Sequence, residues 1–254
     1  MPSDPAAAWC AASSRSRSWC GLAEPERPWV RGRLRRRVLH RLLKAAGYAV
    51  TTAVPVAALA YLVRSRWEPI LHFDESMIRA ATDITRERPG LTQALLVWEQ
   101  MLQPTWVYIA GTLVCVWVWR QHRLPIRALW AFLTMMASWN LALDVKYLVQ
   151  RARPVVEDAI THAPGYSFPS GHAANAAAAS TILVVLCWPL LGRRGRIAAV
   201  VGAGVVMVVT ALDRVFLGVH YPSDVTAGII FGVGLALASY AGYRDWGPNK
   251  LKEQ

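Results

Sequence analysis

Acidic residues and cysteines are scarce in this chain of 254 residues. Asp and Glu together number 16 against 28 Lys and Arg, which gives a net charge of +12. Of the four cysteines, Cys115 and Cys187 lie in apolar blocks, where a thiol behaves as a small hydrophobic group. Cys10 and Cys20 do not have the spacing of a zinc site. The sequence also lacks a glycine-rich nucleotide loop and an internal repeat, so it fits neither a P-loop enzyme nor a repeat protein.

What the chain does have is long apolar blocks. Hydrophobic residues make up 54% of it, and they are grouped rather than alternating, which predicts membrane-spanning helices of roughly 20 residues each. Tryptophans near the block ends are typical of interfacial anchors. The alternative, a soluble protein with buried helices, fits the length of the blocks less well. We expect an all-α bundle of six spans at residues 45–63, about 91–119 with a bend at Pro104, 124–149, 173–191, 197–212 and 225–243.

The basic residues predict the orientation. Seven Lys and Arg residues lie within 31–44, just before the first span, and the connections after the second and fourth spans are basic as well. With six spans these segments share one side, which the positive-inside rule makes cytoplasmic. The loop 64–90, with five arginines on the opposite side, is the exception. We therefore expect a multi-pass plasma-membrane protein.

Three domain segments follow from this topology. Residues 1–44 are expected to be a basic, disordered cytoplasmic segment, 45–243 the six-span domain and 244–254 a short cytoplasmic tail. Next to a span, the arginine-rich run favours contact with anionic lipid over nucleic acid, so no nucleic-acid partner is expected. An uncleaved first span is favoured over a cleaved export signal.

The first of three polar clusters closes the third expected span. Lys146 and Arg153 are seven residues apart and share a face if the helix continues, although Pro154 disfavours helix at Arg153. Arginine offers a planar fork for two phosphate oxygens, and lysine offers a point charge. The alternative is that these residues only extend toward the membrane interface, an interpretation that fits Arg151 best.

The second cluster, Pro169-Ser170-Gly171-His172, opens the fourth expected span. Ser170 can cap the helix, and the free amides of a first helical turn bind anions. Gly171 allows the backbone to approach an oxyanion closely, and His172 can donate a proton to it. The alternative is an ordinary serine cap beside a solvated histidine.

The third cluster places Arg214 at the end of the fifth expected span, and His220 and Asp224 at the start of the sixth. Because His220 and Asp224 are four residues apart, they share a helical face, and a carboxylate there can fix the tautomer of the imidazole. A capping carboxylate with a surface histidine is the alternative. Under the six-span topology all three clusters lie on the same outer side, which predicts one site at the extracytoplasmic membrane interface.

Taken in this order, the three clusters resemble the motifs of the type 2 phosphatidic acid phosphatase (PAP2) superfamily, in its bacterial membrane lipid-phosphatase branch. The resemblance implies that His220 is the nucleophile, that Asp224 orients it, and that His172 protonates the leaving oxygen and then activates water. The phosphoryl oxygens would be held by Lys146, Arg153, Ser170, Gly171 and Arg214. The family works without a metal or other cofactor.

One residue departs from the family pattern: Asp213 stands where a serine usually precedes the arginine of the third cluster. An ionised Asp cannot donate a hydrogen bond to phosphate. We favour the interpretation that Asp213 pairs with a nearby cation such as Lys146 or Arg214, over the alternative that it weakens the phosphate site or alters substrate choice. Glu99 is also unusual near span depth and is a weaker candidate for lining the substrate route.

The resemblance therefore implies a membrane phosphatase that acts on a lipid phosphate or diphosphate, such as a polyprenyl diphosphate, phosphatidate or phosphatidylglycerophosphate. Two alternatives stay open at this point. The same phosphohistidine would serve a lipid-to-acceptor phosphotransferase, and a non-catalytic protein that binds or moves lipid phosphate would need the same cations.

Overall fold

A computed structural model of the chain describes residues 28–155, 160–161 and 163–243. These residues form helices and connections and include no β-strand. The helices are α2 (Pro28–Arg64), α3 (Glu68–Arg86), α4 (Pro89–Met101), α5 (Pro104–His122), α6 (Pro125–Val149), α7 (Gly171–Cys187), a short 3-10 turn η1 (Trp188–Leu190), α8 (Arg193–Phe216) and α9 (Pro222–Tyr243).

The expected spans correspond closely to these helices. Five helical stretches are long and apolar enough to cross a membrane, and the pair α4 and α5, bent by 51° at a short break, makes a sixth when it is counted as one span. The break falls directly before Pro104, where we predicted a bend, because proline can begin a helix but cannot continue one without losing a hydrogen bond. The all-α membrane fold is therefore confirmed.

The N-terminal part differs from expectation. The chain divides into two compact units, Met1–His40 and Arg41–Gln254. We predicted disorder over residues 1–44, but the described part of that segment is helical from Pro28 onward. Its Arg, Leu and Lys residues are good helix formers, so this basic composition is compatible with a helix. Residues 1–27 and the predicted tail 244–254 lie outside the described residues.

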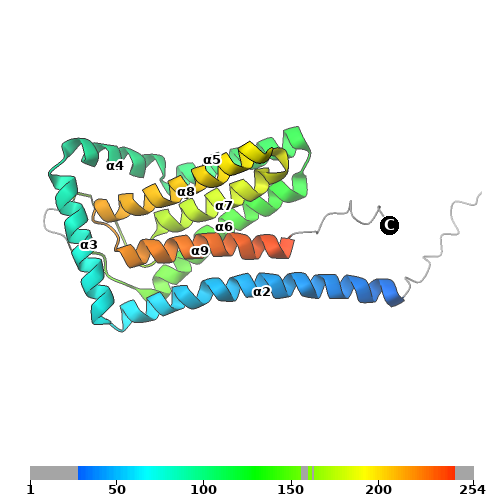
Figure 1. Cartoon of the computed structure of the whole chain (residues 1–254), viewed down its shortest axis with the longest axis horizontal. Coiled ribbons are helices and arrows are strands. Elements are labelled where there is room, and N and C mark those ends of the chain that lie inside the picture. The colour runs from blue at the N-terminus through cyan, green and yellow to red at the C-terminus, as the bar shows by residue number, and fades with distance from the viewer. Residues whose placement is uncertain (1–27, 156–159, 162, 244–254) are drawn as a thin grey trace, which may run out of the picture. The chain divides into compact units, whose positions relative to one another are not determined.

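The segment 64–90 also differs, because we treated it as a loop and it contains the amphipathic helix α3. The buried residues of α3 recur every three or four positions, as expected for a helix with one face against the protein: Asp74, Ile78, Ala81, Thr82 and Thr85. Figure 1 shows α3 lying across the end of the bundle at which α8 ends and α9 begins. This helix thus covers the end that carries the three polar clusters.

Helix α7 packs against α5, α6, α8 and α9 and forms the centre of the second unit. Its run of alanines lets α9 approach closely, as small residues do in membrane bundles. A methyl group at Gly232 of α9 would lie 2.4 Å from the carbonyl oxygen of Ala174, and one at Gly228 would lie 2.8 Å from that of Ser170. This close contact holds the first turns of α7 and α9, with their polar residues, side by side.

Candidate active site

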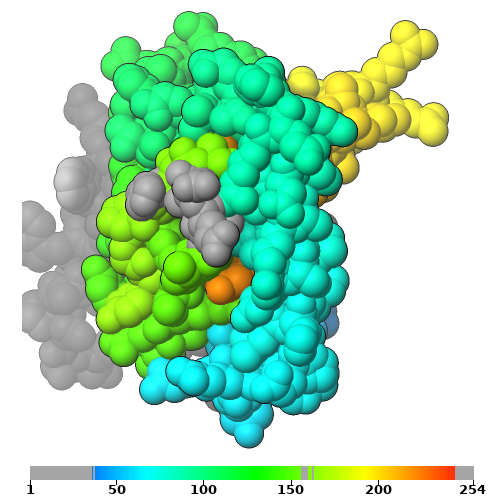
Figure 2. Space-filling model, turned by 90° about the vertical axis from the view of Figure 1, so that its left-hand side faces the viewer, coloured from blue at the N-terminus to red at the C-terminus, as the bar shows by residue number. Residues whose placement is uncertain are grey.

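A cavity of about 190 Å³ lies at the end of the bundle where α6 and α8 end and α7 and α9 begin. Six of the eight predicted site residues line it, namely Lys146, Arg153, Gly171, His172, Arg214 and His220. Its remaining wall is mostly apolar and comprises Pro104, Trp139, Ala142, Leu143, Ala163, Pro164 and Asn175. Figure 2 looks onto this end of the molecule and shows α3 (cyan) beside the end of α6 (green), with a small part of the chain near the start of α9 (orange) visible between them.

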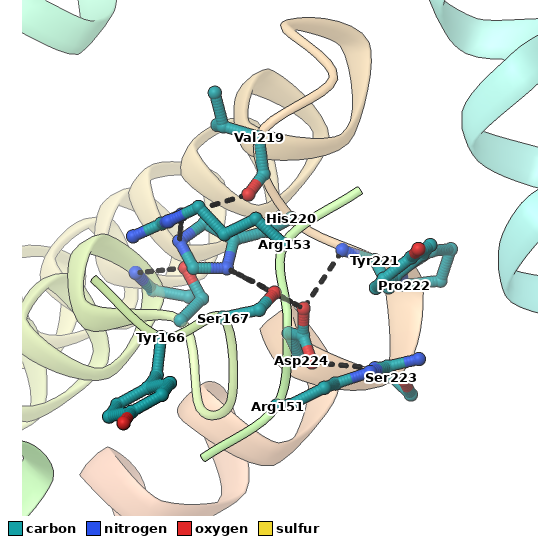
Figure 3. A network of polar contacts seen from close by, with 12 residues as sticks. Arg151, Arg153, Tyr166, Ser167, Val219, His220, Tyr221, Pro222, Ser223 and Asp224 are labelled. Atoms are coloured by element: carbon teal, nitrogen blue, oxygen red, sulfur yellow. Dashed lines mark hydrogen bonds and ion pairs between the residues drawn. The ribbon is translucent and has the colours of Figure 1, made fainter. Parts of the chain in front are cut away.

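His220 is buried, and its two ring nitrogens have different partners. Its Nε2 atom lies 3.1 Å from a terminal nitrogen of Arg153. Since a guanidinium can only donate, Nε2 accepts, and the proton of the neutral ring is on Nδ1. Nδ1 lies 3.5 Å from the hydroxyl oxygen of Ser167 and 3.6 Å from Oδ2 of Asp224. At that length the contact with Asp224 is electrostatic rather than a hydrogen bond. The arrangement, drawn in Figure 3, turns Nε2 toward Arg153, which lines the cavity as His220 does.

Burial decides the charge of this histidine. Loss of solvation lowers the pKa of His220 to about 4, although the nearby carboxylate of Asp224 acts in the opposite direction. The ring is therefore neutral at pH 7, as a nucleophile must be.

Asp224 lies behind His220, is fully buried and does not line the cavity. Its Oδ2 atom accepts hydrogen bonds from the hydroxyl of Ser167 and from the backbone N–H of Tyr221. Its Oδ1 atom accepts a hydrogen bond of 2.7 Å from Arg151. Three donors thus hold the carboxylate in one orientation beside the imidazole.

Lys146 and Arg153 face the cavity with neutral partners. The ammonium of Lys146 donates to the carbonyl of Tyr166 at 2.9 Å. The guanidinium of Arg153 donates to the carbonyls of Gly165 and Val219 as well as to His220. Helix α6 ends at Val149, so the shared helical face that we expected for the two residues does not exist; the connection after α6 brings Arg153 to the cavity instead.

Arg214 is paired differently, because two carboxylates surround it. Asp213 accepts hydrogen bonds from its Nε and from one terminal nitrogen at 2.8 and 2.5 Å, and Glu99 of α4 accepts one from the other terminal nitrogen at 2.7 Å. The structure thus contains the ion pair that we favoured for Asp213. Glu99, which we considered for the substrate route, reaches the site as a partner of Arg214.

The first turn of α7 carries the second cluster. Ser170 is the N-cap, with its side chain accepting from the amide of Ala173, and its own amide donates to the carbonyl of Asp224 at 3.0 Å. A Cβ at Gly171 would lie 3.6 Å from Cε of Lys146, so the glycine keeps this part of the cavity open. The Nε2 atom of His172 is buried and has no hydrogen-bond partner among the described residues.

Three residues of the site were missed by sequence reasoning, and one of them corrects an interpretation. Arg151, which we expected to extend to the membrane interface, is only 9% exposed and binds Asp74 and Asp224. Ser167 and Asp74 are both fully buried. Nothing in the spacing of Asp74 marks it, because it lies about 150 residues away from its partners on α9. Among the described residues, no group of three His, Cys, Asp or Glu side chains is placed to hold a metal ion.

Comparisons with known proteins cover the part of the chain that carries this cavity. The family model described as "PAP2 superfamily" matches residues 127–248, a segment that contains all three clusters. The chain is 35% identical over 37% of its length to phosphatidylglycerophosphatase B of Bacillus subtilis and covers 45% of that protein. It is 34% identical over 41% of its length to decaprenylphosphoryl-5-phosphoribose phosphatase of Mycobacterium tuberculosis and covers 56% of that protein. The chain thus spans about half the length of these curated relatives.

A solved structure shares the fold over a longer stretch. The crystal structure of a transmembrane PAP2-type phosphatidylglycerolphosphate phosphatase from Bacillus subtilis matches 77% of this chain and 94% of its own, with a TM-score of 0.67 and 22% sequence identity. The apolar helices and this match identify a membrane protein. The chain is thus similar to the PAP2 superfamily in the segment 127–248, which carries all three clusters, and it shares the fold of a solved PAP2-type phosphatase.

Proposed function

We propose that this protein hydrolyses the phosphate of a lipid phosphate or lipid diphosphate through a phosphohistidine on His220. The observation that supports the proposal most is the position of Nε2 of His220. It belongs to a neutral ring and contacts Arg153, and both residues line a cavity that also holds Lys146; neither cation has a carboxylate partner among the described residues. A phosphate dianion fits that charge, whereas the third cation of the cavity, Arg214, is paired with two carboxylates.

Each step of the proposed reaction assigns one bond change to a named group. The lone pair of Nε2 of His220 attacks phosphorus while the bond from phosphorus to the lipid oxygen breaks, and His172, in its protonated form, gives its proton to that oxygen and becomes neutral. Water then attacks the phosphohistidine, His172 takes the proton of the water, and the N–P bond breaks to release phosphate. Arg153 must first exchange its hydrogen bond to Nε2 for one to a phosphoryl oxygen, because the guanidinium and the phosphorus atom would otherwise compete for the same lone pair of Nε2.

The apolar wall of the cavity supports a lipid as the substrate. Pro104, Trp139 and Leu143 flank the cations at the end of spanning helices, where a headgroup enters with its chain in the bilayer. The relatives' names include phosphatidylglycerophosphatase, decaprenylphosphoryl-5-phosphoribose phosphatase and lipid A 1-phosphatase, so the lipids that they cover are diverse. We propose that the cavity faces the extracytoplasmic side. The basic segment 31–44 precedes the first span and is cytoplasmic by the positive-inside rule, whereas the clusters follow the third and fifth spans and therefore lie on the other side.

Phosphate release by purified protein in detergent tests the proposal, with dioctanoyl phosphatidate and a short polyprenyl diphosphate as substrates. We expect His220→Ala to lower kcat by at least about 10³-fold, as removal of a nucleophile does in other enzymes. The matched control is His122→Ala, an exposed histidine at the end of α5, which should leave kcat unchanged. Full activity in His220→Ala would exclude the mechanism.

The same assay separates the alternatives. A phosphotransferase would give a phosphorylated product when an alcohol is added as acceptor, whereas a non-catalytic binding protein would leave the lipid unchanged after prolonged incubation. Hydrolysis of dioctanoyl phosphatidate added outside intact cells is the result expected for an extracytoplasmic site, and hydrolysis that appears only after the cells are opened would contradict that orientation.

A further inference from the structure

Arg151 is a buried cation that the proposed reaction does not use directly. One terminal nitrogen donates to Oδ1 of Asp224 and to the hydroxyl oxygen of Ser223, both at 2.7 Å, and the other donates to Oδ2 of Asp74, also at 2.7 Å. The guanidinium carbon lies 4.1 Å from the ring centre of Tyr221. Figure 3 shows Arg151 on the side of Asp224 away from His220. Its side chain is therefore fixed by ion pairs on two sides and by an aromatic ring.

Asp74 connects α3 to the start of α9. Its Oδ1 accepts from the backbone N–H of Ser223 at 3.0 Å, and its Oδ2 accepts from the hydroxyl of Ser223 as well as from Arg151. Ser223 lies in the first turn of α9, where backbone N–H groups have no partner within the helix and a negative charge is stabilised. A carboxylate from α3 thus caps the helix that carries Asp224.

The charges of this network do not cancel. Two carboxylates, Asp74 and Asp224, share the single guanidinium of Arg151, so the group carries one net negative charge behind His220. If Asp74 were neutral, Arg151 and Asp224 would form an isolated neutral pair. The carboxylate would then stabilise the positive charge that forms on the imidazole less strongly.

We infer that Asp74 is a positioning residue: by pairing with Arg151 it keeps Asp224 effectively anionic toward His220, and it couples α3 to the catalytic groups. The inference rests on the proposed function of His220. In addition to Asp224, several charged or titratable groups face His220 from the elements around it: Lys146 of α6, Arg153 of the following connection, His172 of α7 and Arg214 of α8. None of these four residues is substituted in the variants tested below.

The test measures kcat and KM for dioctanoyl phosphatidate in Asp74→Asn, Arg151→Met and the double variant. We expect Asp74→Asn to lower kcat about tenfold, within the range usual for residues in one ion-pair network, while KM changes by less than about twofold. Adding Arg151→Met to Asp74→Asn should raise kcat again by at least about threefold, because Asp224 is then no longer neutralised. Arg151→Met alone leaves two buried carboxylates without a counterion and is expected to be the least stable variant.

Glu75→Gln is the matched control, since Glu75 is on the same helix and pairs with Arg79 at an exposed position. It should leave kcat unchanged. If Asp74 only supported the fold, the double variant would be no more active than Asp74→Asn. Failure of Arg151→Met to restore kcat in the Asp74→Asn background would therefore overturn the inference. An Asp74→Asn variant with the kcat of the wild type would overturn it as well.

An activity-independent measurement separates this inference from the proposed function. The pKa of His220 can be followed by NMR of histidine-labelled protein in detergent, with His220→Gln for assignment. We expect Asp74→Asn to lower this pKa and the double variant to restore it, even in a protein that turns over none of the lipids tested. Inactivity of the wild type would refute the proposed function, whereas an unchanged pKa in Asp74→Asn would refute the positioning role.

Discussion

Replacing Asp213 by serine should strengthen the binding of phosphate, although it removes a buried ion pair. The carboxylate of Asp213 accepts two hydrogen bonds from Arg214, and Glu99 accepts a third, so the cluster of one cation and two anions opposes an incoming dianion. A phosphate bound on the side of the guanidinium opposite to the carboxylate would lie about 7 Å from it. At an effective dielectric constant of about 20, two unit charges at that distance repel by about 2.4 kcal/mol. Each 1.4 kcal/mol corresponds to a tenfold change in affinity.

Orthovanadate, an analogue of phosphate, is a suitable probe because its inhibition constant needs no assumption about the lipid. We expect Asp213→Ser to lower this constant at least about tenfold, and to lower kcat if release of phosphate limits turnover. Glu99→Gln should act in the same direction. Asp83→Asn is the matched control, since Asp83 pairs with Arg86 on the exposed face of α3. A folded Asp213→Ser protein that binds vanadate as the wild type does, or more weakly, would show that Asp213 serves to hold Arg214 in place and does not reduce its charge.

Two further predictions concern pH and packing. Because burial lowers the pKa of His220 to about 4 from an unfolded value of about 6.5, the neutral nucleophile persists as the pH falls, and kcat/KM should decline toward pH 4; a decline centred near pH 6.5 would contradict this. The same shift makes the contribution of His220 to stability complete above pH 6.5 and progressively lost toward pH 4, which acid unfolding curves of wild type and His220→Gln can test. Gly232→Ala should lower the thermal unfolding midpoint, since its Cβ would meet the Ala174 carbonyl at 2.4 Å, whereas Gly202→Ala, with no neighbour within 4 Å, should be neutral or stabilising by up to about 1 kcal/mol. Equal losses in both glycine variants would contradict the packing argument.

The spans and their common polar end could be predicted because the bilayer imposes them. Long apolar blocks have no other stable solution in hydrocarbon. A proline disfavours the interior of a helix, although Pro55 is accommodated inside α2, so Pro104 favours the break before α5 locally. Because successive spans alternate in direction, the three clusters are then expected at the same end of the bundle. The N-terminal part of α2 could not be predicted in the same way, because an arginine-rich composition is compatible both with disorder and with the helix observed from Pro28.

The carboxylate partners could not be predicted, because nothing local distinguishes them. Asp74, Glu75 and Asp83 are all acidic residues of α3, yet Asp74 alone of the three is buried against Arg151 and Ser223. Likewise, Arg151 and Arg153 are two residues apart in the same connection. Their different roles depend on α6 ending at Val149 and on which acceptors the folded chain brings to each guanidinium.

The hydrogen-bond partners of each cation also determine how much positive charge it has left for a ligand. Arg151 and Arg214 each have two carboxylates in the described structure, so the folded chain already provides more negative charge than either cation carries. Lys146 and Arg153 have carbonyls and an imidazole instead, and these neutral acceptors leave their full charge for a ligand. A phosphate that enters the cavity should therefore be held mainly by Lys146 and Arg153. In the same cavity, Arg214 sets how tightly the phosphate stays, because its charge is the one that Asp213 and Glu99 reduce.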